Sequence, residues 1–173
     1  GCVPEYGLLL DENRKGNVLV RVEANMKSAY EYHRLGMMGD KIGEGIPVFT
    51  GLPKVITPEA LRNLGAQLNT SGAYGMYHIL GFTPEAPTLE VAFGGKKPER
   101  EVVITDKDLR DFEEKFSDEL PNGGKIDFAM FGCPHFTLEE AKYIAEHIEG
   151  KKLAIPMYIL VSSHALQMAE RMG

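Results

Sequence analysis

The sequence has few cysteines, and several familiar signals are missing from it altogether. Cys2 and Cys133 are the only two cysteines among 173 residues, which is too few for the disulfide framework of a small secreted protein. No apolar run approaches the roughly 18–20 residues that a membrane span requires, and no signal peptide is recognisable. We therefore expect a cytoplasmic protein that has no membrane partner.

Signals for nucleic acids, nucleotides and simple metal sites are also missing. The net charge is −6 and no basic patch stands out, which argues against a nucleic-acid partner. The glycine-rich stretch 36–45 has neither the GxGxxG pattern nor a phosphate-loop ending, so we exclude nucleotide binding. No Cys-x-x-Cys pair and no His-x-x-x-His pair occurs. We therefore expect structural or surface roles for four of the five histidines, namely His33, His78, His147 and His164.

What the sequence does contain is a pattern of short apolar strands and amphipathic helices. The chain is 43% hydrophobic and 25% charged, as is usual for α/β proteins. In the first part we expect strands at 17–23 and 46–50, helices at 28–41 and 58–68, a helix or buried loop at 71–80, and a possible strand at 88–93. Thr57 and Pro58 mark the start of the second helix as its N-cap and first helical residue.

Strands and helices alternate strictly in the second part of the chain. We expect strands at 101–104, 126–131 and 153–161, followed by helices at 105–116, 138–149 and 163–172. Such alternation predicts βαβ units and a parallel sheet covered by helices, that is, the α/β class. The stretch 85–100 is rich in proline, glycine and lysine, so we divide the chain into two portions, 1–95 and 96–173.

The most informative segment is Gly-Cys-Pro-His-Phe-Thr-Leu-Glu-Glu at 132–140. Thr137 and Glu140 have the spacing of a capping box, which places the start of a helix there. Cys133 and His135 should then lie where a buried strand ends and a helix begins, and open parallel sheets bind ligands at that edge. The other interpretation is that Cys133 is a buried structural residue and His135 a hydrogen-bonded turn residue.

Ser162 and Ser163 follow the next predicted strand in the same way. Strand-to-helix turns in right-handed βαβ units emerge on one side of a sheet, so these serines should lie on the same edge as Cys133 and His135. Free amides at the two helix starts would favour an anion, such as a carboxylate or a phosphate.

The opening segment also carries candidate polar residues. Cys-Val-Pro-Glu-Tyr-Gly at 2–7 leads through three leucines to Asp-Glu-Asn-Arg at 11–14. This arrangement suits an exposed loop, and it equally suits a site where carboxylates and Arg14 meet a hydroxy acid.

Four segments in this order resemble the aconitase X family: 2–14, Ile-Pro-Val-Phe-Thr-Gly-Leu-Pro at 46–53, Gly-Phe-Thr-Pro-Glu-Ala at 81–86, and 132–140. The resemblance covers essentially the whole chain and implies a three-layer α/β/α fold. The large subunit of that family is considerably longer and pairs with a small swivelling subunit. Because the chain opens at Gly1 without methionine, we expect an internal fragment.

The resemblance implies an iron–sulfur hydro-lyase, with a 4Fe-4S cluster as the expected form and a small anionic hydroxy acid as substrate. Cys2 resembles the two-subunit members, which dehydrate (R)-5-phosphomevalonate to trans-anhydromevalonate 5-phosphate in a mevalonate pathway of isoprenoid biosynthesis. Two alternatives stay open: a cis-3-hydroxy-L-proline dehydratase of the same family, and a non-catalytic α/β interaction module.

The resemblance also suggests roles for individual residues. Cys2 and Cys133 are the candidate cluster ligands, Cys2 ranking first, and at least one further thiolate must come from outside the chain. The candidate catalytic residues are His135, Glu5 and Tyr6, and the candidate substrate-binding residues are Glu12, Asn13, Arg14, Ser162 and Ser163.

Overall fold

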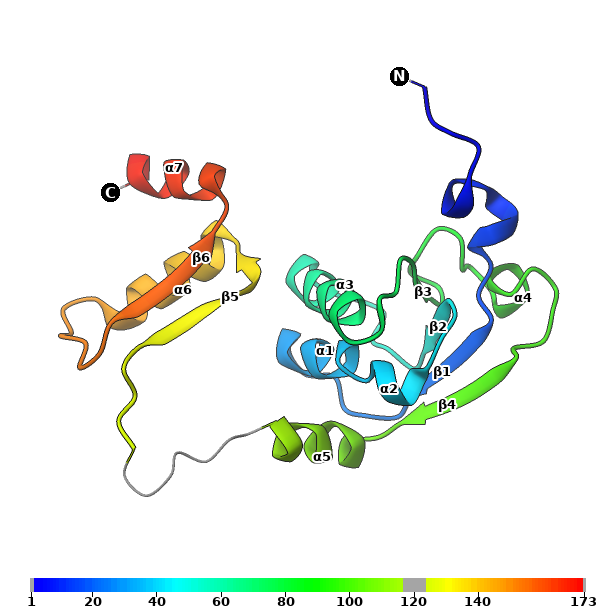
Figure 1. The fold of residues 1–173 in the computed structure, drawn as a ribbon, viewed down its shortest axis with the longest axis horizontal. Coiled ribbons are helices and arrows are strands. Elements are labelled where there is room, and N and C mark those ends of the chain that lie inside the picture. Colours follow the sequence, from blue (N-terminus) through cyan, green and yellow to red (C-terminus); the bar gives the residue numbers. More distant parts are fainter. Residues whose placement is uncertain (1, 117–123, 173) are drawn as a thin grey trace. The chain divides into compact units, whose positions relative to one another are not determined.

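A computed structural model describes residues 2–116 and 124–172 of the chain (Figure 1). It divides into two compact units, Gly1–Ser117 and Asp118–Gly173, and each is described by itself below. Parallel pairing throughout both units confirms the predicted α/β class.

The first unit is built on a four-stranded parallel sheet. Its strands are β1 (Val18–Val22), β2 (Pro47–Thr50), β3 (His78–Ile79) and β4 (Arg100–Ile104), in the spatial order β3-β2-β1-β4. β1 occupies the centre, paired with β2 on one side and β4 on the other. Three of these strands match predicted ones closely, since β-branched, apolar residues favour an extended, buried backbone.

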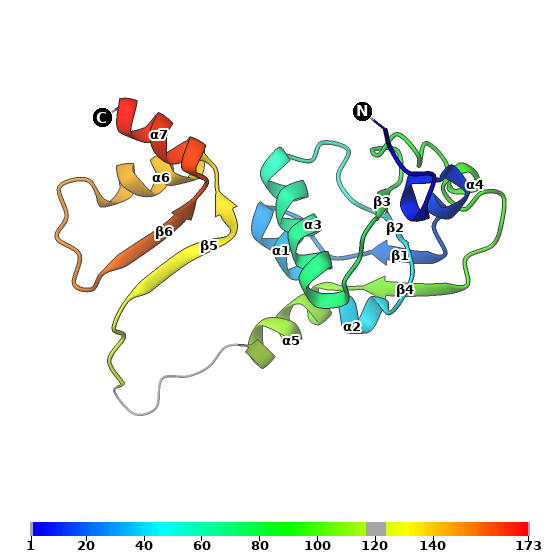
Figure 2. The ribbon, with the colours of Figure 1, turned by 45° about the horizontal axis from the view of Figure 1, so that its top comes forward.

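Helices lie on both faces of this sheet. One face packs against α1 (Ala29–Gly36), α2 (Gly39–Ile42), α3 (Pro58–Gly72) and α5 (Asp106–Phe116), and in Figure 2 α1 and α3 lie side by side. Because side chains alternate along a strand, Val18, Val20 and Val22 enter this main core while Leu19 faces the other way. There Leu19 meets α4 (Leu89–Ala92) and Phe93, which form a second, smaller core.

Three expectations for this unit need correction. The predicted helix 28–41 is two helices, since α1 ends at Gly36 and α2 begins at Gly39. The possible strand 88–93 is helix α4, because the Thr88 side chain accepts a hydrogen bond from the Val91 amide and so caps a helical turn. Stretch 71–80 contains the end of α3 and the two-residue strand β3 instead of a second helix.

The expected division of the chain near residue 95 also differs from the structure. β4 pairs in register with β1, with Val20 opposite Val102, so the residues after 95 belong to the same sheet as the residues before it. The division into two compact units falls between residues 117 and 118.

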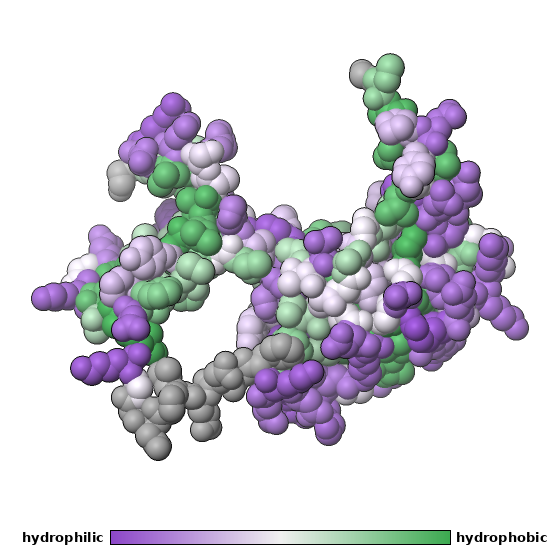
Figure 3. Space-filling view, viewed as in Figure 1, coloured by the Kyte–Doolittle hydropathy of each residue, from purple (hydrophilic) through white to green (hydrophobic). Residues whose placement is uncertain are grey.

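The second unit contains a two-stranded parallel sheet and two helices. β5 (Ala129–Phe136) pairs with β6 (Met157–Val161), and α6 (Leu138–Ile148) and α7 (Ser163–Met172) follow the two strands. The two strands predicted here, 126–131 and 153–161, are not buried. Phe128 and Met130 from the first and Tyr158 from the second are more than half exposed, and apolar side chains reach the surface in Figure 3. Two strands and one helix layer offer too little cover to bury these side chains.

Among the helices that the structure describes, none has the length and apolar character to cross a membrane.

Candidate active site

The opening segment folds into two short 3-10 helices, η1 (Gly7–Leu9) and η2 (Asp11–Arg14). The candidate residues before and within them are exposed to solvent, and Tyr6 is 80% exposed. These exposed candidates are Cys2, Glu5, Tyr6, Glu12 and Asn13. The structure therefore places them together on one surface segment of the first unit.

Arg14 is the exception, because its guanidinium is engaged within the protein. Its Nε donates to both carboxylate oxygens of Glu85 at 2.9 Å, and its Nη2 forms an ion pair with the same carboxylate. Its Nη1 donates to the carbonyl oxygen of Leu8 at 2.7 Å. The hydrogen bond from Arg14 lowers the pKa of Glu85 below its ordinary value, so this carboxylate stays charged.

Sequence reasoning missed Glu85 at this place, and it assigned His78 a structural or surface role without naming its partner. His78 is buried, and its Nε2 lies 2.7 Å from the carbonyl oxygen of Arg14, to which it donates because a carbonyl can only accept. The sequence offered one indirect signal, since Glu85 lies in the resembling segment 81–86. Nothing in the spacing of these residues predicted their contact with Arg14.

The Cys-Pro-His corner lies inside the last part of β5 and not in a turn after it. Phe131 pairs with Ile159 and Phe136 with Val161, so five positions of β5 match two positions of β6. The intervening residues therefore form a bulge that holds Cys133 and His135, both exposed, and the Cys133–Pro134 peptide bond is cis. Bulges of this kind redirect side chains at the end of a strand.

The helix after the corner starts where the sequence predicted. Thr137 Oγ1 accepts a hydrogen bond from the Glu140 amide at 3.2 Å, and the Glu140 carboxylate accepts one from the Thr137 amide at 2.8 Å. This complete capping box fixes the first residue of α6 as Leu138.

The two strand ends of the second unit lie on the same edge, as predicted. β5 and β6 are parallel, and their last residues, Phe136 and Val161, are paired. Ser162 therefore follows at the same edge, where its Oγ accepts a hydrogen bond from the Ala165 amide at 3.1 Å and caps α7. Ser163 is the first residue of that helix. A role for either serine in substrate binding stays a prediction.

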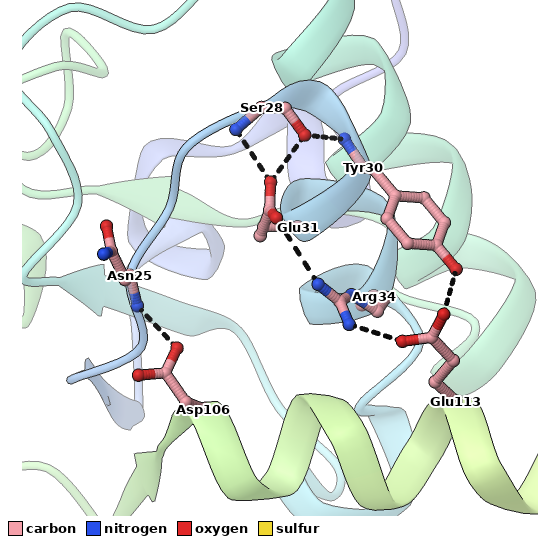
Figure 4. A network of polar contacts seen from close by, with 7 residues as sticks. All are labelled: Asn25, Ser28, Tyr30, Glu31, Arg34, Asp106 and Glu113. Atoms are coloured by element: carbon pink, nitrogen blue, oxygen red, sulfur yellow. Dashed lines mark hydrogen bonds and ion pairs between the residues drawn. The ribbon is translucent and has the colours of Figure 1, made fainter.

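The carboxyl edge of the first sheet has a polar network of its own (Figure 4). The Asn25 amide, after β1, donates to Asp106 at the start of α5. Arg34 forms ion pairs with Glu31 and, at 2.7 Å, with Glu113 of α5. Arg34 thus bridges a carboxylate of α1 and a carboxylate of α5, so the network is suited to fastening these two helices together.

The candidate residues fall into two sets, one in each unit. Cys2 and the residues up to Arg14 belong to the first unit, while Cys133, His135 and the two serines belong to the second. Within residues 2–116 and 124–172, no group of three or more His, Cys, Asp or Glu side chains is placed to hold a metal ion.

Each of the two units matches a domain of a known protein family. The aconitase X second-domain family matches residues 16–114, and the aconitase X third-domain family matches residues 126–173. The chain belongs to the aconitase X family. The second-domain match lies within the first compact unit, and the third-domain match lies within the second.

Individual aconitase X relatives match over the whole chain. The phosphomevalonate dehydratase large subunit of Thermococcus kodakarensis is 38% identical over 100% of this chain, which covers 43% of that relative. The corresponding subunit of Methanothermobacter thermautotrophicus is 34% identical, with 41% of its length covered. The cis-3-hydroxy-L-proline dehydratase of Pseudomonas aeruginosa is also 34% identical over the whole chain, with 30% of its length covered. The chain thus spans less than half the length of these relatives.

A solved structure agrees with this assignment. The crystal structure of Thermococcus kodakaraensis aconitase X in its holo-form matches with a TM-score of 0.83 and 37% sequence identity. The match covers 98% of this chain and 42% of that chain.

Proposed function

We propose that this chain is part of a hydro-lyase large subunit that dehydrates (R)-5-phosphomevalonate to trans-anhydromevalonate 5-phosphate in a mevalonate pathway of isoprenoid biosynthesis. The observation that carries the proposal is the similarity, over the whole chain, to relatives named phosphomevalonate dehydratase large subunit. Their name as large subunits supports a small subunit as the partner, which we expect to be the swivelling domain of the same enzyme.

The thiols of the chain suit an iron–sulfur cluster but are too few to hold it alone. Cys2 and Cys133 are both exposed, and thiolates are the usual ligands of such clusters. An aconitase-type cluster with one open iron needs three thiolates, so at least one must come from outside the chain. When bound, such a cluster supplies a Lewis acid that makes the substrate hydroxyl a better leaving group.

The remaining chemistry falls to the side chains of the protein. Removing water also requires a base for the proton next to the substrate carboxylate, and we propose that it is one of His135, Glu5 and Tyr6. The amino ends of α6 and α7, which begin at the same edge of the second sheet, suit an anionic group of the substrate. Ser162 and Ser163 are our candidates for contacts there, and Glu12 and Asn13 are candidates on the first unit.

The decisive experiment uses the complete enzyme, with its small subunit, after anaerobic reconstitution with iron and sulfide. We expect a coloured protein that dehydrates 5-phosphomevalonate, detected by mass spectrometry of the product. Turnover of cis-3-hydroxy-L-proline instead would support the second candidate function, which the Pseudomonas aeruginosa relative favours. A colourless protein that is inactive on both compounds would overturn the proposal and favour a non-catalytic module.

We also propose that the enzyme works in the cytoplasm. Two exposed cysteines that serve as metal ligands must stay reduced, and cytoplasmic redox conditions keep thiols in that state.

A further inference from the structure

The contacts of Arg14 leave it poorly suited to the substrate-binding role that its charge suggests. Its guanidinium meets the Glu85 carboxylate through two nitrogens, the side-on geometry that makes arginine–carboxylate pairs strong. Its third nitrogen donates to the Leu8 carbonyl oxygen. With its charge neutralised and its side chain only 27% exposed, Arg14 offers little to an incoming anion.

The same residue joins the opening segment to the sheet. The Arg14 carbonyl oxygen accepts from buried His78 of β3, and the Gly16 amide donates to the Ala92 carbonyl oxygen of α4 at 2.8 Å. Arg14 therefore has its backbone fixed to one strand while its side chain is fixed to the loop that carries Glu85.

Hydrogen bonds within the opening segment connect Arg14 and Asn13 to residues 7 and 8. The Arg14 side chain holds the Leu8 carbonyl oxygen, and the Asn13 side chain donates to the Gly7 carbonyl oxygen at 3.0 Å. The amides of Leu10 and Asn13 close the two 3-10 turns. The exposed candidates Glu12 and Asn13 thus stand on a segment whose shape depends on Arg14.

We propose that Arg14, Glu85 and His78 form a clasp that positions residues 7–13, so that Arg14 and Glu85 are positioning residues and neither is a substrate ligand. The structural part of this proposal stands on the contacts alone. Its consequence for turnover rests on the proposed function, because misplaced substrate-binding groups slow a reaction even when they stay present.

The two possible roles of Arg14 predict opposite effects for Glu85→Gln. If Arg14 binds substrate, removing the Glu85 charge frees its guanidinium, and KM should fall or stay unchanged. If Arg14 belongs to a clasp, Glu85→Gln and Arg14→Ala both loosen the segment and both lower kcat/KM. The Arg14→Ala/Glu85→Gln double variant should then be no worse than the more damaging single variant, since each single change already breaks the pair.

The test combines hydrogen exchange with kinetics on the complete enzyme. Glu101→Gln is the matched control, because it makes the same chemical change in the exposed Arg21–Glu101 pair between β1 and β4. We expect Glu85→Gln to speed hydrogen exchange of the peptide 8–16 by about tenfold and to leave the exchange rates of the core strands unchanged. We expect kcat/KM to fall by about 10- to 100-fold, while Glu101→Gln alters neither quantity.

Unchanged exchange of the peptide 8–16 in Glu85→Gln would overturn the clasp. A lower KM in that variant would overturn it too, and would show that Arg14 is a substrate ligand restrained by Glu85. If the unaltered enzyme fails to dehydrate 5-phosphomevalonate, the proposed function fails, but the exchange measurement still decides whether the clasp exists.

Discussion

Cys2 is the residue on which the proposed cluster chemistry depends most directly. It lies exposed in the opening segment, and its thiolate would be a soft ligand for iron. In the complete enzyme we expect Cys2→Ser to lose cluster colour, iron content and activity together, because a serine oxygen is a poor substitute for a thiolate. Visible absorbance and iron per protein after anaerobic reconstitution measure this.

Cys133→Ser is the matched comparison for Cys2→Ser. It makes the same chemical change at an exposed cysteine, but this cysteine lies in the bulge of β5. We expect this variant to keep more iron than Cys2→Ser does, since Cys133 ranks second as a ligand. Full iron content and normal turnover in Cys2→Ser would rule out a ligand role for Cys2.

Asp108 makes the first unit sensitive to acid. Burial alone would raise its pKa, but hydrogen bonds from Lys41 and Thr105 outweigh burial and lower the pKa from 3.8 to about 2. Because the folded pKa lies below the unfolded one, the unfolded chain binds more protons between about pH 4 and pH 2, and stability is lost as the pH falls through that window. After solvent screening the loss is about 1 kcal/mol.

Urea unfolding at pH 5.5 and pH 3 tests this prediction. Asp108→Asn should be less stable than the unaltered protein at pH 5.5 and should lose less stability on acidification. Asp111→Asn, which removes an exposed pair with Lys107 on the same helix, should behave like the unaltered protein. Equal acid sensitivity in all three proteins would contradict the assignment.

At the residue scale, the sequence could predict which side chains are polar and near one another in the chain, but not which distant partner neutralises them. Arg14 and Glu85 are separated by 71 positions, and no local pattern encodes their pairing. The sequence therefore identified Arg14 as a candidate substrate ligand, whereas its contacts support a positioning role.

At the scale of elements, helix starts were predictable where a cap lies within a few residues of the helix it serves. Thr137 with Glu140 and Thr57 with Pro58 mark the first turns of α6 and α3 in the sequence as they do in the structure. Helix α4, within 88–93, was predicted as a possible strand although Thr88 is an equally local cap. A short apolar run suits a strand or a helix, and its pattern outweighed the cap in the prediction.

Gly132 is needed for the bulge that carries Cys133 and His135. Its φ is +144°, and a Cβ at this position would lie 2.3 Å from the Leu160 Cβ on the neighbouring strand. We expect Gly132→Ala to destabilise the second unit by about 1–3 kcal/mol, through backbone strain and this close contact. Thermal unfolding with hydrogen exchange of the β5 and β6 amides would measure the loss.

Gly150→Ala is the comparison, since Gly150 also has a positive φ, +69°, and its Cβ would meet nothing within 4 Å. It should cost less than Gly132→Ala, because non-glycine residues tolerate a φ of +69° better than one of +144° and because no close contact is added. Equal costs for both glycine variants would contradict this account of Gly132.

At the scale of the whole molecule, strand pairing decided what the sequence could not. The proline- and glycine-rich stretch 85–100 has the composition of a linker, yet β4 directly after it pairs with β1 some eighty positions earlier. Composition reports local flexibility, whereas the extent of a unit depends on which distant strands share hydrogen bonds. The division near residue 95 therefore could not have been corrected from local pattern.

The second unit illustrates the same limit for burial. An uninterrupted apolar strand predicts cover on both faces. The described residues of this unit supply two strands and two helices, and leave Met130, Tyr158 and Leu160 exposed. The apolar pattern correctly indicated strands here, but it does not say how far their side chains are buried.

The last prediction concerns the 173 residues as an isolated protein. They contain two cysteines, whereas an aconitase-type cluster with one open iron needs three thiolates, and they cover only 43% of the length of the Thermococcus kodakarensis large subunit. We therefore expect the isolated chain to bind no stable cluster and to leave 5-phosphomevalonate unchanged. Iron and sulfide analysis after anaerobic reconstitution, with product detection by mass spectrometry, measures both outcomes, and the complete enzyme treated in parallel is the positive control. Dehydration by the isolated chain would show that two thiols suffice, and it would remove the reason for seeking a ligand elsewhere in the large subunit.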